Sequence, residues 1–292
     1  MPFTFRPYRR FPVQGSVTDN ADPFLTLSLA YFSGFWSLIT LLFLSSAPVY
    51  AEWVPVDGND QAGMAVAQLN LIQVLDHKPA AVVPVPQTKS WWTTQHEHTL
   101  ARIRQGEVDL LLIGDSITHG WADEGRRIWD AYYGRRRAVN LGFNGDRTEH
   151  VLWRLDHGEI EGISPKLVVV MIGTNNTGTR HDPPEETAAG IQAILTTLRM
   201  RLPVTKILLL GVFPRSASAD DPFRRLNAAI NDRLRHYADN QQVFFLDLSP
   251  RFHDGRGRLS QDLMPDYLHP SERGYQVWAD GMEDMIRKLL GE

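Results

Sequence analysis

The chain has 292 residues, of which 43% are hydrophobic and 22% are charged, a composition typical of a globular protein. Its formal net charge of −4 gives no indication of a polyanionic partner, and no segment has the signature of a nucleic-acid-binding module. The absence of cysteine excludes disulfides, a thiolate nucleophile and any cysteine-ligated metal.

The first feature along the chain is an uncharged, mostly apolar stretch between Asp22 and Glu52. Arginines precede it, and it ends in VYA at residues 49–51, which fits the small-x-Ala pattern read by signal peptidase. We therefore expect residues 1–51 to be a cleaved signal peptide and the protein to be exported, into the periplasm or the medium. The stretch is also long enough to span a bilayer, so an uncleaved anchor that tethers the protein to a membrane is the alternative.

Residues 52–90 lack apolar periodicity and are rich in Pro, Gly, Gln and Ala, which is typical of a linker. Residues 91–292 are regular. Apolar runs predict five strands, in VDLLLIG, RAVNLG, KLVVVMIG, TKILLLGV and QVFFLDL. Helical patterns are found around residues 147–156, 185–201, 222–238 and 271–290. Continuous apolar strands that alternate with amphipathic helices predict one doubly wound α/β domain, with a parallel sheet covered on both faces.

Polar stretches that contain glycine follow the first three predicted strands, with the sequences GDS, GFNGD and GTNN. The carboxyl ends of parallel strands meet at one edge of a sheet, where α/β proteins bind their ligands. We therefore expect Ser116, Gly145 and Asn175 to lie close together although they are far apart in the sequence.

Near the C-terminus, the sequence PDYLHP places Asp266 three residues before His269. This spacing lets both side chains of a single turn point the same way. Pro270 biases His269 out of the helical region, so the last helix should begin after it.

Together these residue types form the parts of a serine hydrolase. A serine hydroxyl such as that of Ser116 becomes a good nucleophile when an imidazole, here that of His269, accepts its proton. Asp266 would hold the other ring nitrogen and stabilise the imidazolium. The backbone N–H groups of Ser116 and Gly145 and the side-chain amide of Asn175 would donate to the oxyanion of the tetrahedral intermediate.

The blocks GDSIT, NLGFNGD, GTNN and DYLHP, in this order, resemble those of the SGNH (GDSL-type) hydrolases. The resemblance covers roughly residues 91–290. It is closest to the catalytic subunits of platelet-activating-factor acetylhydrolase and to exported bacterial relatives, since HVLWRLDHGEIEGISPK at 150–166 is also similar. Two departures are Asn144, where that subgroup usually has glycine, and the export signal.

The resemblance implies a three-layer flavodoxin-like fold and ester hydrolysis without a metal or organic cofactor. It also implies that the residues beside the nucleophile and the catalytic histidine, here Ile117 and Leu268, wall the acyl site. Both are bulky and apolar, which favours short acyl groups, above all acetyl. The substrate would then be a small ester or an acetylated glycan.

Several alternatives stay open at this stage. Asp115 and Ser116 could simply cap a helix, and Asn175 could close a turn, although Asn176 suits that role better. His119 is a rival base, but no acid is spaced to orient it. The histidines of HEH at 96–98 lack a third ligand, so we interpret them as solvated rather than as metal ligands.

Two other functions fit the same residues. A lysophospholipase or thioesterase would act on long acyl chains, which need a lengthy apolar groove. A non-catalytic glycan-binding protein could keep the fold and the pocket without turnover. The sequence leaves open whether the chain forms a homodimer.

Overall fold

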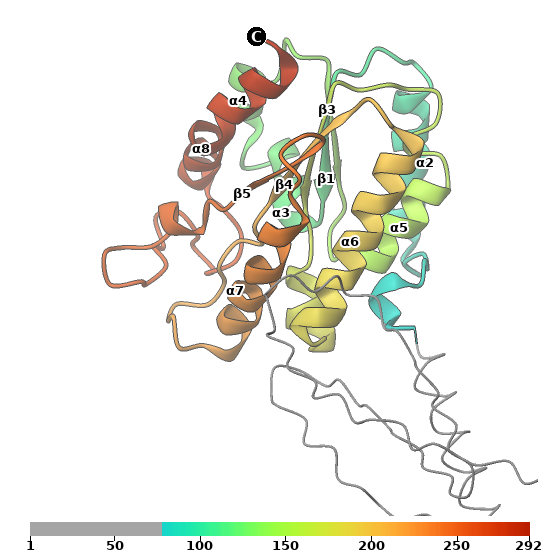
Figure 1. Ribbon diagram of the computed structural model, residues 1–292. Helices are drawn as coiled ribbons and strands as arrows, with labels where there is room; N and C mark the ends of the chain where they lie inside the picture. Colours follow the sequence, from blue (N-terminus) through green and yellow to red (C-terminus); the bar gives the residue numbers. More distant parts are fainter. Residues whose placement is uncertain (1–77) are drawn as a thin grey trace, which may run out of the picture. The chain divides into compact units, whose positions relative to one another are not determined.

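A computed structural model describes residues 78–292, which contain a five-stranded parallel sheet (Figure 1). The strands are β1 (Leu110–Gly114), β2 (Ala138–Gly142), β3 (Leu167–Met171), β4 (Lys206–Leu210) and β5 (Val243–Leu246). Their order in the sheet is β2-β1-β3-β4-β5, and every pair is parallel. This is the order of flavodoxin-like folds, which confirms the predicted fold class.

Helices connect and cover the strands. The longer ones are α2 (Ser90–Ile103), α4 (Arg126–Tyr132), α5 (Thr148–Asp156), α6 (Pro184–Arg201), α7 (Pro222–Leu234) and α8 (Glu272–Leu290). The short ones are η1 (Ala80–Val82), α3 (Ser116–His119), η2 (Gly120–Ala122), the π-helical turn η3 (Asn176–Arg180), η4 (Arg235–Tyr237) and η5 (Ser249–Arg251). The predicted helices after β2, β3, β4 and β5 are thus present; α2 and α4 were not predicted.

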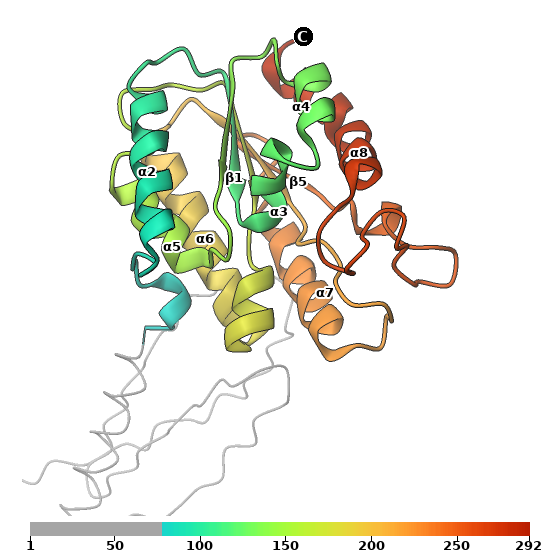
Figure 2. The same cartoon turned by 180° about the vertical axis from the view of Figure 1, so that it is seen from behind.

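The sheet separates two apolar cores, as the alternation of side chains along each strand requires. Leu111 and Ile113 of β1 belong to the core formed with α2, α5, α6 and α7. Leu110 and Leu112 point the other way, into the core formed with α3, α4 and α8. Figures 1 and 2 show these helices as layers on opposite sides of the sheet. The result is a three-layer sandwich in which all five residues of β1 are buried.

The connections reverse direction between β1 and β3. After β1 the chain passes through α3 and α4 on one face to the edge strand β2, and after β2 it returns through α5 on the other face to β3. The segments after β1 and β3 therefore leave the sheet toward opposite faces, which opens a crevice at the carboxyl edge. Ser116 follows β1 and Asn175 follows β3, so both flank this switch point.

The folded body begins earlier than the sequence predicts. Residues 78–90, which we expected to belong to the linker, lie against α5 and α6. Ala81 of η1 is fully buried, and its carbonyl accepts a hydrogen bond from the Thr148 hydroxyl at 2.8 Å. The stretch with the two prolines is exposed, but it is attached to the domain through the Val85 N–H, which donates to the carbonyl of Glu149 at 3.3 Å. The predicted signal peptide and residues 52–77 of the predicted linker lie outside the described residues.

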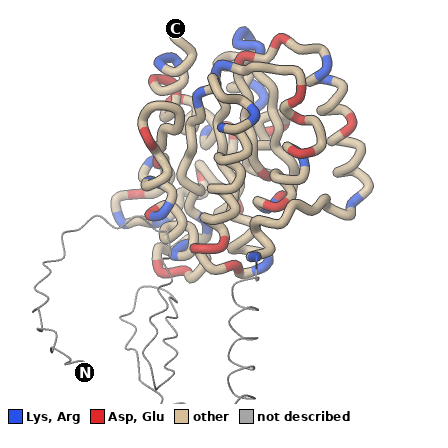
Figure 3. The backbone as a smooth tube through the Cα atoms, turned by 45° about the vertical axis from the view of Figure 1, so that its right-hand side comes forward, with Lys and Arg blue, Asp and Glu red and all other residues tan. Residues whose placement is uncertain are grey.

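The distribution of charged residues over residues 78–292 does not indicate a charged partner (Figure 3). Acidic and basic residues are interspersed along the backbone rather than separated by sign (Figure 3). Among residues 78–292, no helix combines the length and the apolar character needed to cross a bilayer.

The sheet edge is shaped by close backbone approaches that only glycine allows. A Cβ on Gly142, the last residue of β2, would lie 2.1 Å from the backbone nitrogen of His119. The C-terminal end of α3, at Thr118 and His119, can therefore rest directly on β2, and this contact helps to fix the position of the short helix that follows β1.

We predict that Gly142→Ala lowers the free energy of unfolding by about 1–3 kcal/mol or more, because the new methyl group must displace the backbone of α3. Gly255→Ala is the matched control, since a Cβ there has nothing within 4 Å. It should change stability by less than about 0.5 kcal/mol. Urea denaturation of both variants measures the difference, and equal stabilities would contradict the importance of this contact.

Candidate active site

Ser116 is the first residue of α3, at the carboxyl end of β1. Asp115 precedes it as the N-cap, and its carboxylate accepts a hydrogen bond from the Ile117 N–H at 3.0 Å. The carboxyl of Asp115 is buried, and this burial raises its pKa to about 7. The capping interpretation therefore holds for Asp115, while the Ser116 hydroxyl is left to face the sheet edge.

The Ser116 hydroxyl lies 2.9 Å from Nε2 of His269. On the other side of the ring, Nδ1 of His269 is 2.6 Å from Oδ2 of Asp266. The three side chains thus form one continuous chain of hydrogen bonds, although Ser116 and His269 are 153 residues apart. A serine held in this way can transfer its proton to the imidazole.

The turn from Asp266 to His269 is fixed by its own backbone. Oδ1 of Asp266 accepts hydrogen bonds from the N–H groups of Leu268, at 2.9 Å, and His269, at 2.7 Å. Partial burial opposes ionisation of Asp266, but the hydrogen bonds from His269 and from the two backbone amides outweigh it and hold the pKa below its usual value. Asp266 is therefore an anionic partner for the imidazole.

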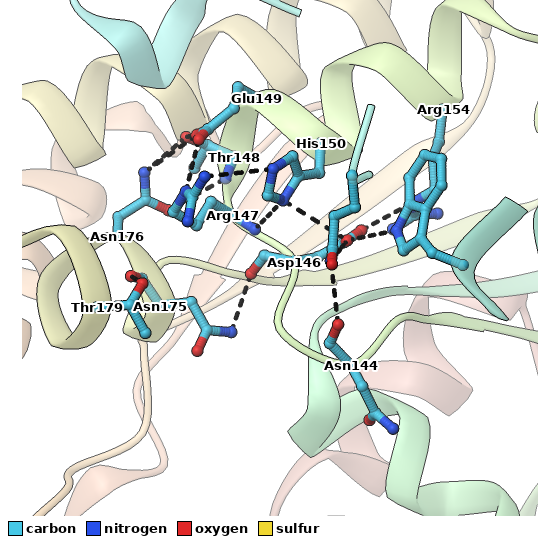
Figure 4. Close-up of polar contacts among 12 residues, drawn as sticks. Asn144, Asp146, Arg147, Thr148, Glu149, His150, Arg154, Asn175, Asn176 and Thr179 are labelled. Carbon is cyan, nitrogen blue, oxygen red and sulfur yellow. Dashed lines mark hydrogen bonds and ion pairs between the residues drawn. The ribbon is translucent and has the colours of Figure 1, made fainter. Parts of the chain in front are cut away.

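Three hydrogen-bond donors lie on the segments after β1, β2 and β3. In the part of the chain that the structure describes, the backbone N–H groups of Ser116 and Gly145 have no hydrogen-bond acceptor. Nδ2 of Asn175 donates to the backbone carbonyl of Asp146 at 3.0 Å, which orients the amide and leaves its second hydrogen free (Figure 4). Each donor that the sequence predicts therefore has a hydrogen available for a ligand, on a segment that follows one of three neighbouring strands.

The His119 side chain has no hydrogen bond to this chain of hydrogen-bonded side chains among the described residues. Its Nδ1 is 3.2 Å from the carbonyl oxygen of Gly142 and 3.3 Å from Nε2 of Gln95. Contrary to our expectation, an acid does accompany it, because Nε2 lies 3.5 Å from Asp123. This ring is thus held at the end of β2, along a shallow pocket of about 650 Å³ that also includes Trp91.

The two residues expected to wall the acyl site belong to one apolar cluster. Ile117 is only 1% exposed and lies within the core formed with α4 and α8, while Leu268 is partly buried and packs against that core. Of these two residues, Leu268 is therefore the one with surface that an acyl group could contact, whereas Ile117 belongs to the core.

A buried polar network, which the sequence did not predict, lies behind the donors (Figure 4). Its centre is Asp146, whose carboxylate accepts hydrogen bonds from Gln87 at 2.7 Å, Trp92 at 2.7 Å and Arg154 at 2.8 Å. Burial raises the pKa of Asp146 to about 6, although the Arg154 charge opposes the shift. The only sequence signal for this network was the position of Asp146, directly after the candidate oxyanion glycine.

His96 belongs to the same network, so our interpretation of it as solvated was wrong. Its Nδ1 lies 3.0 Å from Oε1 of the buried Glu159, which also pairs with Arg154. His96 further stacks on the ring of Trp92. The histidine is therefore a structural partner of a buried carboxylate. Within residues 78–292, no group of three or more His, Cys, Asp or Glu side chains is placed to hold a metal ion.

Known proteins share this sequence and this fold. The model of the GDSL-like lipase/acylhydrolase family matches residues 112–277, more than half of the chain. Subunit alpha1 of human platelet-activating factor acetylhydrolase IB is 35% identical over 216 residues, which cover 74% of this chain and 90% of that protein.

Two solved structures are similar in fold. A putative platelet activating factor structure from Streptococcus pneumoniae has a TM-score of 0.56 at 24% identity, covering 77% of this chain and 99% of that one. The acetylxylan esterase Axe2 from Geobacillus stearothermophilus has a TM-score of 0.51 at 22% identity, covering 64% and 95%. From the family match and the identity to the acetylhydrolase subunit, we conclude that the chain belongs to the GDSL-like lipase/acylhydrolase family, whose members are hydrolases that act on esters.

Proposed function

We propose that the protein is a serine esterase that hydrolyses short-chain esters, above all acetyl esters, through an acyl-enzyme. The observation that carries this proposal is the unbroken chain of hydrogen bonds from the Ser116 hydroxyl through His269 to Asp266. The relatives support the choice of acyl group, since one is named as an acetylhydrolase subunit and another as an acetylxylan esterase.

In the proposed mechanism, Oγ of Ser116 attacks the ester carbonyl while Nε2 of His269 takes its proton. The negative charge of Asp266 stabilises the imidazolium that results. The carbonyl oxygen becomes an oxyanion, which accepts hydrogen bonds from the N–H groups of Ser116 and Gly145 and from Nδ2 of Asn175. His269 then returns the proton to the leaving alcohol, and the acyl group stays on Ser116.

Water completes the cycle by attacking the acyl-enzyme, with His269 again acting as the base. The same donors stabilise the second tetrahedral intermediate. We further propose that the alcohol half of the substrate is a small molecule or a glycan and that the protein acts after export, as the apolar N-terminal stretch indicates.

We predict that a fluorophosphonate probe labels Ser116 and no other residue, because among the hydroxyls of residues 78–292 only that of Ser116 has an imidazole partner positioned to accept its proton. Mass spectrometry of the labelled protein locates the adduct. Ser116→Ala should abolish labelling, and labelling that persists in this variant would disprove the assignment.

His119 provides the control for the base. His269→Ala should abolish both labelling and turnover, whereas His119→Ala should keep most of the activity, since its ring is bound to Gly142 and Gln95. The reverse result would assign the base to His119.

We predict that Asn175→Ala lowers kcat by about 100- to 1000-fold with little change in KM, because its amide donates to an oxyanion that exists only in the transition state and the intermediate. The neighbouring Asn176 is the matched control. Its buried side chain accepts a hydrogen bond from the Thr148 N–H and donates to Asp182, both at 3.0 Å.

Asn176→Ala should instead lower stability by about 1–3 kcal/mol, because buried partners lose their hydrogen bonds. The folded fraction of that variant should remain active. Thermal midpoint and kcat, measured side by side, separate the two roles. If Asn175→Ala lost stability and kept kcat, Asn175 would be a turn residue.

We predict that kcat/KM for nitrophenyl esters is highest between acetate and butyrate and falls steeply by octanoate. Each methylene that fits would gain about 0.8 kcal/mol of burial, so a preference for short chains must come from steric exclusion by the wall around Leu268. Leu268→Ala should shift the optimum to longer chains. A kcat/KM that rises steadily to dodecanoate would favour a long-chain lipase instead.

A further inference from the structure

One side chain from the N-terminal segment contacts the loop after β2 on both sides of Gly145. Nε2 of Gln87 donates to the backbone carbonyl of Asn144 at 3.0 Å and to Oδ1 of Asp146 at 2.7 Å. Both hydrogens of the Gln87 amide are therefore used on this loop. Gln87 precedes the region that matches the family model, and its partners are 57 and 59 residues away.

The contact to Asn144 determines the direction of the candidate oxyanion donor. The carbonyl of Asn144 and the N–H of Gly145 belong to the same peptide unit, which is planar and trans. In such a unit the C=O and N–H bonds point in opposite directions. A hydrogen bond that holds the Asn144 carbonyl toward Gln87 therefore holds the Gly145 N–H away from Gln87.

The turn that contains this peptide is closed by the hydrogen bond from the Asp146 N–H to the Phe143 carbonyl at 3.1 Å, and Gln87 adds a contact to the central peptide unit of the turn. Gly145 has φ of +73°, in the left-handed region that glycine adopts without steric cost, and a Cβ there would have only Nε2 of Gln87 within 4 Å. No other side chain of the described residues donates to the Asn144 carbonyl. On the far side, Asp146 is fixed by Trp92 and Arg154 as well. Within this turn, Gln87 is thus the side chain of the described residues that restrains the Asn144–Gly145 peptide through its carbonyl.

Gln87 itself is placed firmly. Before it, the carbonyl of Ala81 accepts a hydrogen bond from Thr148 at 2.8 Å, and the N–H of Val85 donates to the carbonyl of Glu149 at 3.3 Å. After it, α2 begins at Ser90. The segment is attached to the domain before Gln87 and continues into α2 after it, which limits the positions that the Gln87 amide can take.

We propose that Gln87 is a positioning residue that orients the Gly145 N–H for the oxyanion, so that the segment before α2 completes the active site. The inference rests on the proposed function, because it assigns Gln87 a role in that mechanism. An oxyanion donor contributes only when it is aimed in advance, and a displacement of about 1 Å at a reacting centre can cost about 100-fold in rate.

The test uses two variants of the full chain. Gln87→Met keeps the length of the side chain and removes both donors. Gln87→Glu keeps its shape but places an acceptor against the Asn144 carbonyl and the Asp146 carboxylate. We expect both to lower kcat for a nitrophenyl acetate by about 10- to 100-fold with KM nearly unchanged, and Glu to be at least as harmful as Met.

Val85→Ala is the matched control in the same segment, because Val85 is 41% exposed and the substitution keeps the hydrogen bond of its backbone N–H to Glu149. It should keep the kcat of the wild type. Thermal midpoints of all variants are measured in parallel. A loss of kcat that is explained by loss of folded protein, or a Glu variant that is more active than the Met variant, would assign Gln87 a packing role and overturn the inference.

The outcome separates this inference from the proposed function. Wild-type kcat in Gln87→Met, with Ser116 still labelled by the fluorophosphonate, would reject the role of Gln87 and leave the esterase intact. A binding measurement adds a second readout. A trifluoromethyl ketone forms a tetrahedral adduct with an oxyanion, so its affinity should fall in parallel with kcat in both Gln87 variants, and an unchanged affinity would contradict the proposal.

Discussion

The buried carboxylate of Asp146 is the point on which the candidate site depends. Its side chain is fully buried and is held by Trp92 of α2, Arg154 of α5 and Gln87 of the segment before α2. Its backbone carbonyl in turn orients the amide of Asn175. One residue therefore connects the loop after β2 to the loop after β3 and to two elements of the surrounding layer.

Burying charged groups costs free energy unless each has a partner, and the charged side chains of this network are all paired. Arg154 lies between Asp146 and Glu159, with all three side chains fully buried. Removing one partner of a buried ion pair generally costs about 3–5 kcal/mol, whereas an apolar replacement of the whole set is often neutral. Stability alone does not account for such a network. It does provide rigid and directional hydrogen bonds, which a cluster of apolar side chains could not supply to the backbone around Gly145.

The fold was predictable because its signals are local. Apolar runs and amphipathic patterns alternate after residue 106. The five strands of the structure lie at the apolar runs, and the helices after β2, β3, β4 and β5 lie at the amphipathic patterns. Helix α2 was missed because much of its surface is polar and its buried residues include His96. The segment with Gln87 resembled a linker, since its partners lie 57 and 59 residues away and no local pattern reveals them. The candidate site residues Ser116, His269, Asp266 and Asn175 could be proposed from the sequence because their motifs are short and their order is distinctive, and the structure joins the first three by hydrogen bonds.

The site combines a rigid half and an open half. Asp146 is fully buried and Asn175 is 9% exposed, whereas the side chains of His269 and Asp266 are 43% and 55% exposed. In the proposed mechanism this asymmetry suits the two tasks. Stabilising an oxyanion requires dipoles that are already aimed, because any reorganisation in the transition state reduces the benefit. The base must instead meet a leaving alcohol and then an incoming water, so it has to be reached from the solvent. The buried polar network around Asp146 meets the first requirement. The exposed turn that carries His269 meets the second, at the same edge of the sheet.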